Sequence, residues 1–400
     1  MRIWSSVTSF IVATLCGLSC TGGGSPGGEI TVAIALLSSE QPAYRLVLNQ
    51  FTEETGIHVR LIVQQYQQVR EALEAEVRAG QGQLDLVELD VYMLAQVYRS
   101  VLPLDSLVGT FSDIREAVDS AAFRAGSPPE ADGWTHFLPH RLNWQAMVYD
   151  ASLLSQPPGT WDELLDVCRQ HAGAIGFKAS RYEGMVCDFF PFLWQSGGDP
   201  LQPRSSGSLR ALRFLKQISP TLNPAVRSYK EVSILQAQER QEVILHFNWP
   251  FVVPLVRKKG LMRSRIRVAP LPAGPAGSVT VLGGGYLGIP RTAPHPSEAA
   301  LLVDFLLSEQ VQRRLTRDLG WFPVRDAGWE ELSEDDRIDF SGYLEMRGGL
   351  RARPAVPHYG EISRIWQQGF SDLLFEGKSA DEVAAFVESR LEELGEAHRP

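Results

Sequence analysis

The sequence predicts an α/β protein of two domains, each a mainly parallel sheet flanked by helices. Two observations lead to this prediction. From Glu29 onward, apolar runs of strand length alternate with segments of helical spacing, a pattern typical of parallel strands joined by helical crossovers. The chain has 400 residues, 44% of them apolar, which is enough for two domains of ordinary size with buried cores.

The first predicted domain opens with three strands and two helices in alternation. Gly56 and Gly80 each follow an amphipathic segment, and a glycine at that position is typical of a helix end. The apolar runs around these segments have the length and composition of buried strands. The predicted order is strand Ile30–Leu37, helix Gln41–Thr55, strand Ile57–Val63, helix Val69–Ala79 and strand Leu84–Leu89.

The same alternation returns later in the chain. Thr160 with Glu163, and Ser379 with Glu382, have the spacing of capping boxes, so each pair predicts a helix start. The predicted strands are Asn143–Tyr149, Val243–Phe247, Ile266–Pro270 and Ser278–Pro290, the last broken by three glycines at 283–285. The predicted helices are Pro250–Lys259, Ser297–Leu315 (one or two helices), Glu361–Phe375 and Ser379–Leu394.

The N-terminus has the layout of a secretory signal. The apolar run Ile3–Leu18 is shorter than the ~18 residues that span a membrane, and a glycine-rich stretch follows Cys20. We therefore predict a signal peptide over residues 1–19, a lipid on Cys20, a flexible linker over 20–28, and an extracytoplasmic location in the periplasm or on the outer face of the cytoplasmic membrane. The alternative is ordinary cleavage near the same place, with Cys20 unmodified.

The net charge excludes some classes of binding partner, and the cysteine content allows one disulfide. The net charge of -9 argues against nucleic acid and against an anionic membrane surface, so membrane contact is expected through the lipid anchor only. Cys168 and Cys187 are the cysteines beyond the linker, and in an oxidising compartment they can form one disulfide. A pair of buried free thiols is the equal alternative.

Three chemical motifs do not predict catalysis. The spacing of a nucleophile elbow at 23–27 lies in the linker, although that motif needs a strand before it and a helix after it. Gly283–Gly288 has the glycine spacing of a dinucleotide site, but the following Ile289 and Pro290 do not begin a helix. His136 and His140 are separated by Pro139 and lack metal-site spacing. We expect no catalytic residues, no cofactor and no metal ion.

Eight segments, in this order, resemble the family-1 extracellular solute-binding proteins, the receptors of bacterial ABC importers that include maltose- and trehalose-binding proteins. Each segment alone is a weak signal, whereas their order across 29–394 is specific. The segments are Leu48–Ile57, Leu84–Asp90, Pro158–Leu165, Phe192–Gly198, Gly283–Pro290, Gly320–Arg325, Arg353–Ser363 and Gly377–Glu382.

This resemblance implies a type II periplasmic-binding-protein fold, in which two α/β lobes close by a hinge motion on a ligand in the cleft. The expected N-terminal lobe comprises 29–139 and 287–320, and the expected C-terminal lobe comprises 144–280 and 327–394. The chain would cross between lobes near 139–143, 281–286 and 321–326. The expected state is a monomer.

The resemblance and the local sequence together predict a ligand site. Asp90 comes directly after a buried strand, where open α/β sheets bind ligands, and Trp249 follows another strand. Alternatives are helix capping for Asp90, an interaction with a helix dipole for Glu40, a surface salt bridge for Arg353 and core packing for the aromatics. The candidate residues are Glu40, Gln65, Asp90, Asn143, Trp249, Gly284, Gly285, Tyr286 and Arg353. Further aromatics near the predicted cleft are Trp144, Trp194, Trp321 and Tyr359.

The implied function is capture of a small carbohydrate, a di- or oligosaccharide, and its delivery to the transmembrane subunits of an ABC permease. Sugars have flat C–H faces that stack on aromatic rings, and hydroxyls that bond to carboxylates and amides. The alternatives are a polyamine, a sugar phosphate or a peptide bound by the same fold. A secreted hydrolase is the third hypothesis.

Overall fold

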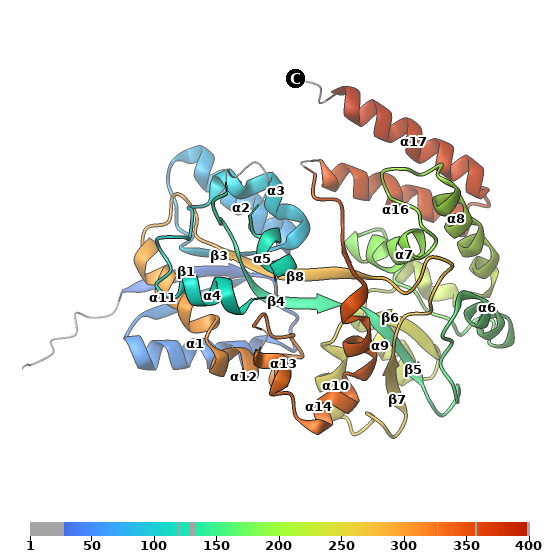
Figure 1. The fold of residues 1–400 in the computed structure, drawn as a ribbon, viewed down its shortest axis with the longest axis horizontal. Coiled ribbons are helices and arrows are strands. Elements are labelled where there is room, and N and C mark those ends of the chain that lie inside the picture. Colours follow the sequence, from blue (N-terminus) through green and yellow to red (C-terminus); the bar gives the residue numbers. More distant parts are fainter. Residues whose placement is uncertain (1–27, 119, 128–132, 326, 357, 398–400) are drawn as a thin grey trace, which may run out of the picture.

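The computed structural model describes residues 28–118, 120–127, 133–325, 327–356 and 358–397 (Figure 1). The predicted signal peptide, Cys20 and all of the linker but Gly28 lie outside the described residues. Within the described part of the chain, every helix is too short or too polar to cross a membrane.

Among the described residues, nine strands form two sheets. They are β1 (Glu29–Ile34), β2 (His58–Val63), β3 (Leu86–Asp90), β4 (Leu138–Trp144), β5 (Ala146–Asp150), β6 (Leu245–Asn248), β7 (Ile266–Ala269), β8 (Thr280–Gly288) and β9 (Leu350–Ala352).

The helices of the first 260 residues are α1 (Gln41–Thr55), α2 (Tyr66–Ala79), α3 (Leu94–Val97), α4 (Phe111–Ala117), α5 (Ser120–Ala125), α6 (Trp161–Gln170), α7 (Glu183–Gln195), α8 (Ser206–Ile218), α9 (Glu231–Glu239) and α10 (Val252–Lys258). Those that follow are α11 (Pro296–Leu306), α12 (Glu309–Leu319), α13 (Ala327–Glu330), α14 (Glu334–Asp339), α15 (Ser341–Met346), α16 (Tyr359–Phe375) and α17 (Ala380–Ala397). Short 3-10 turns span Val91–Met93, Tyr98–Ser100, Ser219–Thr221, Pro224–Ser228 and Arg347–Gly349.

The larger sheet has the order β2-β1-β3-β8-β4, with β9 beside β8. Strands β1, β2 and β3 are parallel, as the alternation with α1 and α2 predicts. Both faces of β1 are covered: Val32 and Ile34 belong to the core that contains α1, whereas Ala33 belongs to the core that contains α2. The carboxyl ends of these parallel strands therefore share one edge, which is where the candidate site lies.

The smaller sheet corrects part of the prediction. Its order is β6-β5-β7, and β5 is antiparallel to both neighbours, so this sheet is not mainly parallel. Strands β6 and β7 do run in the same direction, as their connection through α10 predicts. The single strand predicted over Asn143–Tyr149 is instead two strands, β4 in the larger sheet and β5 in the smaller, with Gln145 alone between them. Because this link is so short, β5 enters the smaller sheet in the direction of β4.

Strand β8 is a second correction, because the three glycines do not break it. It is continuous over Thr280–Gly288 and buried throughout. It pairs antiparallel with both β3 and β4 and parallel with β9. Strand β4 pairs with all three glycines and β3 pairs with Gly285 as well, and this pairing holds the glycines extended. Figure 1 shows β4 and β8 extended side by side along the molecule, with β4 pointing toward the part that holds the smaller sheet and β8 running in the opposite direction.

Helix boundaries follow the sequence signals closely. Helix α1 has the predicted bounds, since Pro42 lies in its first turn and Gly56 ends it in the left-handed region at φ 75°. Thr160 and Glu163 form the predicted capping box of α6, and Ser379 and Glu382 exchange the same bonds at the start of α17.

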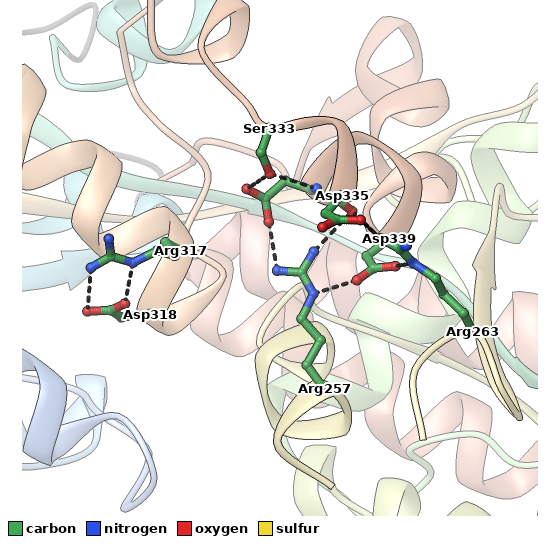
Figure 2. A network of polar contacts seen from close by, with 8 residues as sticks. Arg257, Arg263, Arg317, Asp318, Ser333, Asp335 and Asp339 are labelled. Carbon is green, nitrogen blue, oxygen red and sulfur yellow. Dashed lines mark hydrogen bonds and ion pairs between the residues drawn. The ribbon is translucent and has the colours of Figure 1, made fainter. Parts of the chain in front are cut away.

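A network of ion pairs, called the rear network here, connects Arg257, Arg263, Asp335, Asp336 and Asp339 (Figure 2). Asp339 accepts from Nε of both arginines, and Arg257 also bonds to Asp336 at 2.7 Å. These bonds fasten α14 to the end of α10 and to the loop before β7.

Candidate functional site

A cavity of about 760 Å³ lies at the carboxyl edge of the larger sheet and extends to α7, α9 and α16. Its size is within the range of small-molecule sites, about 300–1,000 Å³. Seven of the nine residues predicted for the site line it, so the structure brings together positions that are up to 313 residues apart. They are Glu40, Gln65, Asp90, Asn143, Trp249, Gly284 and Arg353.

The floor cluster consists of Tyr66, Glu88, His140 and Arg141, and it lies beneath the cavity. Glu88 is fully buried, bonds to Arg141 at 2.6 Å and to Nδ1 of His140 at 2.5 Å, and accepts from the Tyr66 hydroxyl at 2.9 Å. Burial alone would raise the pKa of Glu88, but Arg141 and His140 outweigh it and lower this pKa. Within this cluster, Glu88 and Arg141 therefore form a charged pair that is fixed at the base of the cavity.

Glu40 lies at the edge of this cluster. It accepts from the Trp321 indole at 2.8 Å and from the backbone N of Leu37 at 2.7 Å, and the guanidinium of Arg141 lies over the Trp321 ring at 4.1 Å. Burial raises the pKa of Glu40, and Arg141 only partly offsets this effect. Glu40 is the N-cap residue of α1, although its side chain makes no capping bond there, so its interaction with the helix dipole stays an alternative.

Three residues form what we call the bridge: Asp90, Glu183 and Arg353. Nη2 of Arg353 donates to Asp90 at 2.6 Å and Nη1 donates to Glu183 at 2.8 Å. The Arg353 side chain is only 1% exposed, so the surface salt bridge considered as an alternative is wrong. Burial raises the pKa of Asp90 against the opposing effect of Arg353. The capping alternative for Asp90 holds in part, because it also accepts from the backbone N of Tyr92 at 3.5 Å.

Trp249 lines the cavity with a half-buried side chain held by its backbone. Its N donates to Asn248 at 3.0 Å, and its carbonyl accepts from the Tyr343 hydroxyl at 2.9 Å. The ring lies against β8 at Gly283, where an added Cβ would come within 3.0 Å of it. Because Gly283 has no side chain, the ring can lie directly against the strand, and a surface is left for stacking.

Two predicted residues, Gly285 and Tyr286, do not line the cavity. Tyr286 is fully buried, and its hydroxyl donates to the carbonyl of Ala122 at 2.9 Å. An added Cβ at Gly285 would lie 2.4 Å from the Glu88 carboxyl, so this glycine makes room for the floor cluster. The predicted cleft wall at these two positions is wrong because the register of β8 with β3 carries them past the cavity into the sheet.

The remaining predicted residues have mixed outcomes. Oδ1 of Asn143 is buried and has no hydrogen-bond partner among the described residues. Gln65 precedes α2, and its backbone N donates to Gln68 at 3.0 Å. Trp321 lines the cavity with Trp249, whereas three other aromatics are buried outside the lining: Trp144, Trp194 and Tyr359.

Cys168 and Cys187 are buried free thiols, which is the second of the two alternatives considered, and no disulfide joins them. Burial raises the pKa of Cys168 to about 11, and it also raises the pKa of Cys187. His136 and His140 are held by other contacts: His136 packs edge-on against Tyr98, and His140 belongs to the floor cluster.

Sequence reasoning missed four side chains of the candidate site: Glu88, Tyr92, Arg141 and Glu183. Glu88 did carry a signal, since an ionisable residue in an otherwise apolar strand needs a partner when it is buried. Arg141 lies in a segment already predicted to cross the cleft. Glu183 and Tyr92 had no comparable signal, because their partners are more than 160 residues away in the chain.

Two α/β parts around a cavity lined by an aromatic ring and buried polar groups are the architecture of the type II periplasmic-binding fold. The chain belongs to the bacterial extracellular solute-binding protein family, whose model matches residues 47–328. This family membership implies that the chain works outside the cytoplasm.

Individual relatives agree with this assignment. A probable ABC transporter-binding protein of Deinococcus radiodurans is 25% identical over 378 residues, which covers 85% of this chain and 87% of the relative. A norspermidine sensor of Vibrio cholerae is 26% identical over 98 residues, 24% of this chain and 25% of the relative. The maltose-bound structure of MalE3 from T. maritima has a TM-score of 0.82 and 24% identity, covering 92% of this chain and 100% of that one.

Proposed function

We propose that this chain captures a small carbohydrate, a di- or oligosaccharide, in the cavity and delivers it to an ABC permease without making or breaking a bond. The observation that carries the proposal is the half-buried Trp249 ring on the glycine surface of β8, beside carboxylate and amide groups. A ring face and several fixed polar groups are what a sugar needs. The maltose in the T. maritima neighbour supports the same ligand class.

The charge arrangement supports an uncharged solute. Each arginine of the lining has a carboxylate partner. Arg141 is paired with Glu88, and Arg353 with both Asp90 and Glu183. Arg70 is paired with Glu74 and Arg364 with Glu361. A phosphate would need a free arginine fork. Sugar phosphates are therefore the least favoured of the candidate solutes.

We propose the lobe bounds given above, with crossings near 139–143, 281–286 and 321–326. The strand pairing supports the first two crossings, since β4 leads directly into β5 and β8 is continuous. The third crossing lies partly outside the described residues, at position 326. A lipid on Cys20 would tether the mature monomer to the membrane, and the linker would let it reach its permease.

A polyamine is the second candidate, favoured by one observation. Acidic side chains in the cavity lining outnumber basic ones by six to four, which favours a cation over an anion. The acids are Glu40, Glu71, Asp90, Glu183, Glu231 and Glu361, and the bases are Arg70, Arg141, Arg353 and Arg364. The norspermidine sensor supports this alternative over a short segment.

Calorimetric titration of the mature chain with disaccharides, sugar phosphates, peptides and polyamines tests these proposals. We expect a disaccharide to bind at about 1 μM, which corresponds to about 8 kcal/mol. If no carbohydrate binds and a polyamine does, the sugar proposal is overturned. Release of free monosaccharide during the titration would indicate a hydrolase instead.

A Trp249→Ala variant tests the stacking role. We expect it to weaken sugar binding by at least tenfold, because ring stacking and the buried ring area are lost. Trp134→Ala is the matched control, since Trp134 is 52% exposed and lies outside the cavity lining. Equal affinities of the two variants would remove Trp249 from the site.

A further inference from the structure

We infer that Glu183 is a positioning residue, which fixes Arg353 across the cleft so that the two halves are joined before a solute arrives. The inference rests on the proposed function for the nature of the cavity. Glu183 is the first residue of α7 and lines the cavity, while Arg353 follows β9. Asp90 ends β3, in the larger sheet.

The contacts of Glu183 show that its carboxylate is already occupied. Oε1 accepts from Nη1 of Arg353 at 2.8 Å and from the Tyr359 hydroxyl at 2.6 Å. Oε2 accepts from Oγ of Ser363 at 2.7 Å. Tyr359 and Ser363 both lie in the first turns of α16, so Glu183 fastens α16 and Arg353 to the start of α7.

Arg353 then reaches the other half. Its Nη2 donates to Oδ1 of Asp90 at 2.6 Å, and its guanidinium lies over the Tyr92 ring at 4.6 Å. Tyr92 in turn packs on Tyr359 at 5.1 Å. An ion pair and two ring contacts therefore join the ends of β3 and α16.

This arrangement leaves one acceptor of Asp90 for a ligand. Oδ1 is taken by Arg353 and by the backbone N of Tyr92, while no described residue donates to Oδ2. Because Glu183 and Asp90 hold Arg353 from both ends, the orientation of Oδ2 is set in advance. A solute hydroxyl that donates to Oδ2 meets an ordered acceptor, and less ordering entropy is lost on binding.

The test is Glu183→Gln in the mature chain, which removes the charge at this position with little change in shape. We expect small-angle scattering of the ligand-free variant to give a larger radius of gyration than wild type, since Arg353 loses one of its two anchors. We also expect an affinity loss of about tenfold for the sugar that wild type binds. Glu242→Gln is the control, because it removes an exposed Arg240–Glu242 pair outside the cavity.

A double-variant cycle separates positioning from simple packing. If Glu183 acts through Arg353 on Asp90, the affinity losses of Glu183→Gln and Asp90→Asn do not add in the double variant. Ser363→Ala removes a single bond to Glu183 and keeps its charge, so it provides a milder variant should Glu183→Gln fold poorly. We expect Ser363→Ala to expand the ligand-free chain by a smaller amount.

Two results would overturn the inference: ligand-free scattering of Glu183→Gln and Ser363→Ala identical to wild type, or additive affinity losses in the cycle. Failure of the carbohydrate proposal gives a different result. In that case no sugar binds to wild type, yet Glu183→Gln still expands the ligand-free chain, because the scattering measurement needs no solute.

Discussion

The bridge and the rear network use the same chemistry, arginine with carboxylates, in very different surroundings. The arginines differ in burial: Arg353 of the bridge is 1% exposed, whereas Arg257 and Arg263 of the rear network are 27% and 43% exposed. The carboxylates do not follow this order, because Asp90 and Glu183 of the bridge are 18% and 23% exposed and Asp339 of the rear network is 4% exposed. The bridge connects the larger sheet to α7 and α16, while the rear network fastens α14 to α10 and a nearby loop. In Figure 1, α7 and α16 lie above β8, and α10 and α14 lie below it.

The comparison teaches that burial decides what such pairs contribute. Exposed ion pairs are worth about 0–1 kcal/mol, because solvent and salt screen them. Removing one partner from a buried pair costs about 3–5 kcal/mol, since the remaining charge stays buried and unpaired. We therefore expect the bridge to dominate stability and solute binding, and the rear network to act as a local fastening.

Replacing one arginine in each network is the strongest test of this contrast. Arg353→Met leaves Asp90 and Glu183 without their shared partner, and we expect it to lower the free energy of unfolding by about 3 kcal/mol. Arg257→Met should lower it by about 1 kcal/mol, because Asp339 keeps Arg263. Urea denaturation measures both values. Equal losses for the two variants would break the comparison.

The second test compares the acid sensitivity of the buried floor cluster with that of the rear network, and its expected effect is smaller. In the folded chain, Arg141 and His140 hold the pKa of Glu88 below its ordinary value of 4.5 despite burial. A lowered carboxyl pKa adds stability that is present above the ordinary value and is lost as the pH falls through the folded value. We expect wild-type unfolding free energy to fall below about pH 4.5, and Glu88→Gln to be less stable at neutral pH but flatter in acid.

Asp336 of the rear network provides the comparison for that titration. Burial would raise its pKa, but Ser333 and Arg257 lower it, so it has the same sign as Glu88. Because solvent reaches this network, Asp336→Asn should flatten the acid limb by less than Glu88→Gln. A larger effect from Asp336→Asn would contradict the view that burial sets the contribution.

Salt gives the smallest expected effect. Raising the ionic strength from 0.05 to 0.5 M shortens the screening length to a few ångströms and weakens exposed pairs first. The stability difference between wild type and Arg257→Met should therefore shrink by roughly 0.5 kcal/mol. The difference between wild type and Arg353→Met should stay the same within error. Thermal unfolding at both salt concentrations checks this.

Much of the fold could be predicted because local signals set it. Pro42 and Gly56 determine the ends of α1, and Thr160 with Glu163 determines the start of α6. The direction of β5 could not be predicted, because it depends on Gln145 being the whole connection to β4. Similarly, the glycines of β8 looked like a break, and their pairing with β4, a strand more than 130 residues earlier in the chain, keeps them in a strand.

The site divides in the same way. Asp90 and Trp249 were predicted because each follows a strand, which is a property of the local sequence. Tyr286 looked equivalent, yet the register between β8 and β3 carries it into the core. Glu183 could not be predicted, since its role comes from Arg353, a residue 170 positions away.

The two buried thiols have a practical consequence for reporter design. Cys168 and Cys187 are shielded from solvent, and with a pKa of about 11 Cys168 is hardly ionised at neutral pH. Maleimide dyes react with exposed thiolates, so a cysteine added at the rim of the cavity would be labelled selectively. The chain thus offers a scaffold for a fluorescent solute sensor in which neither Cys168 nor Cys187 has to be replaced.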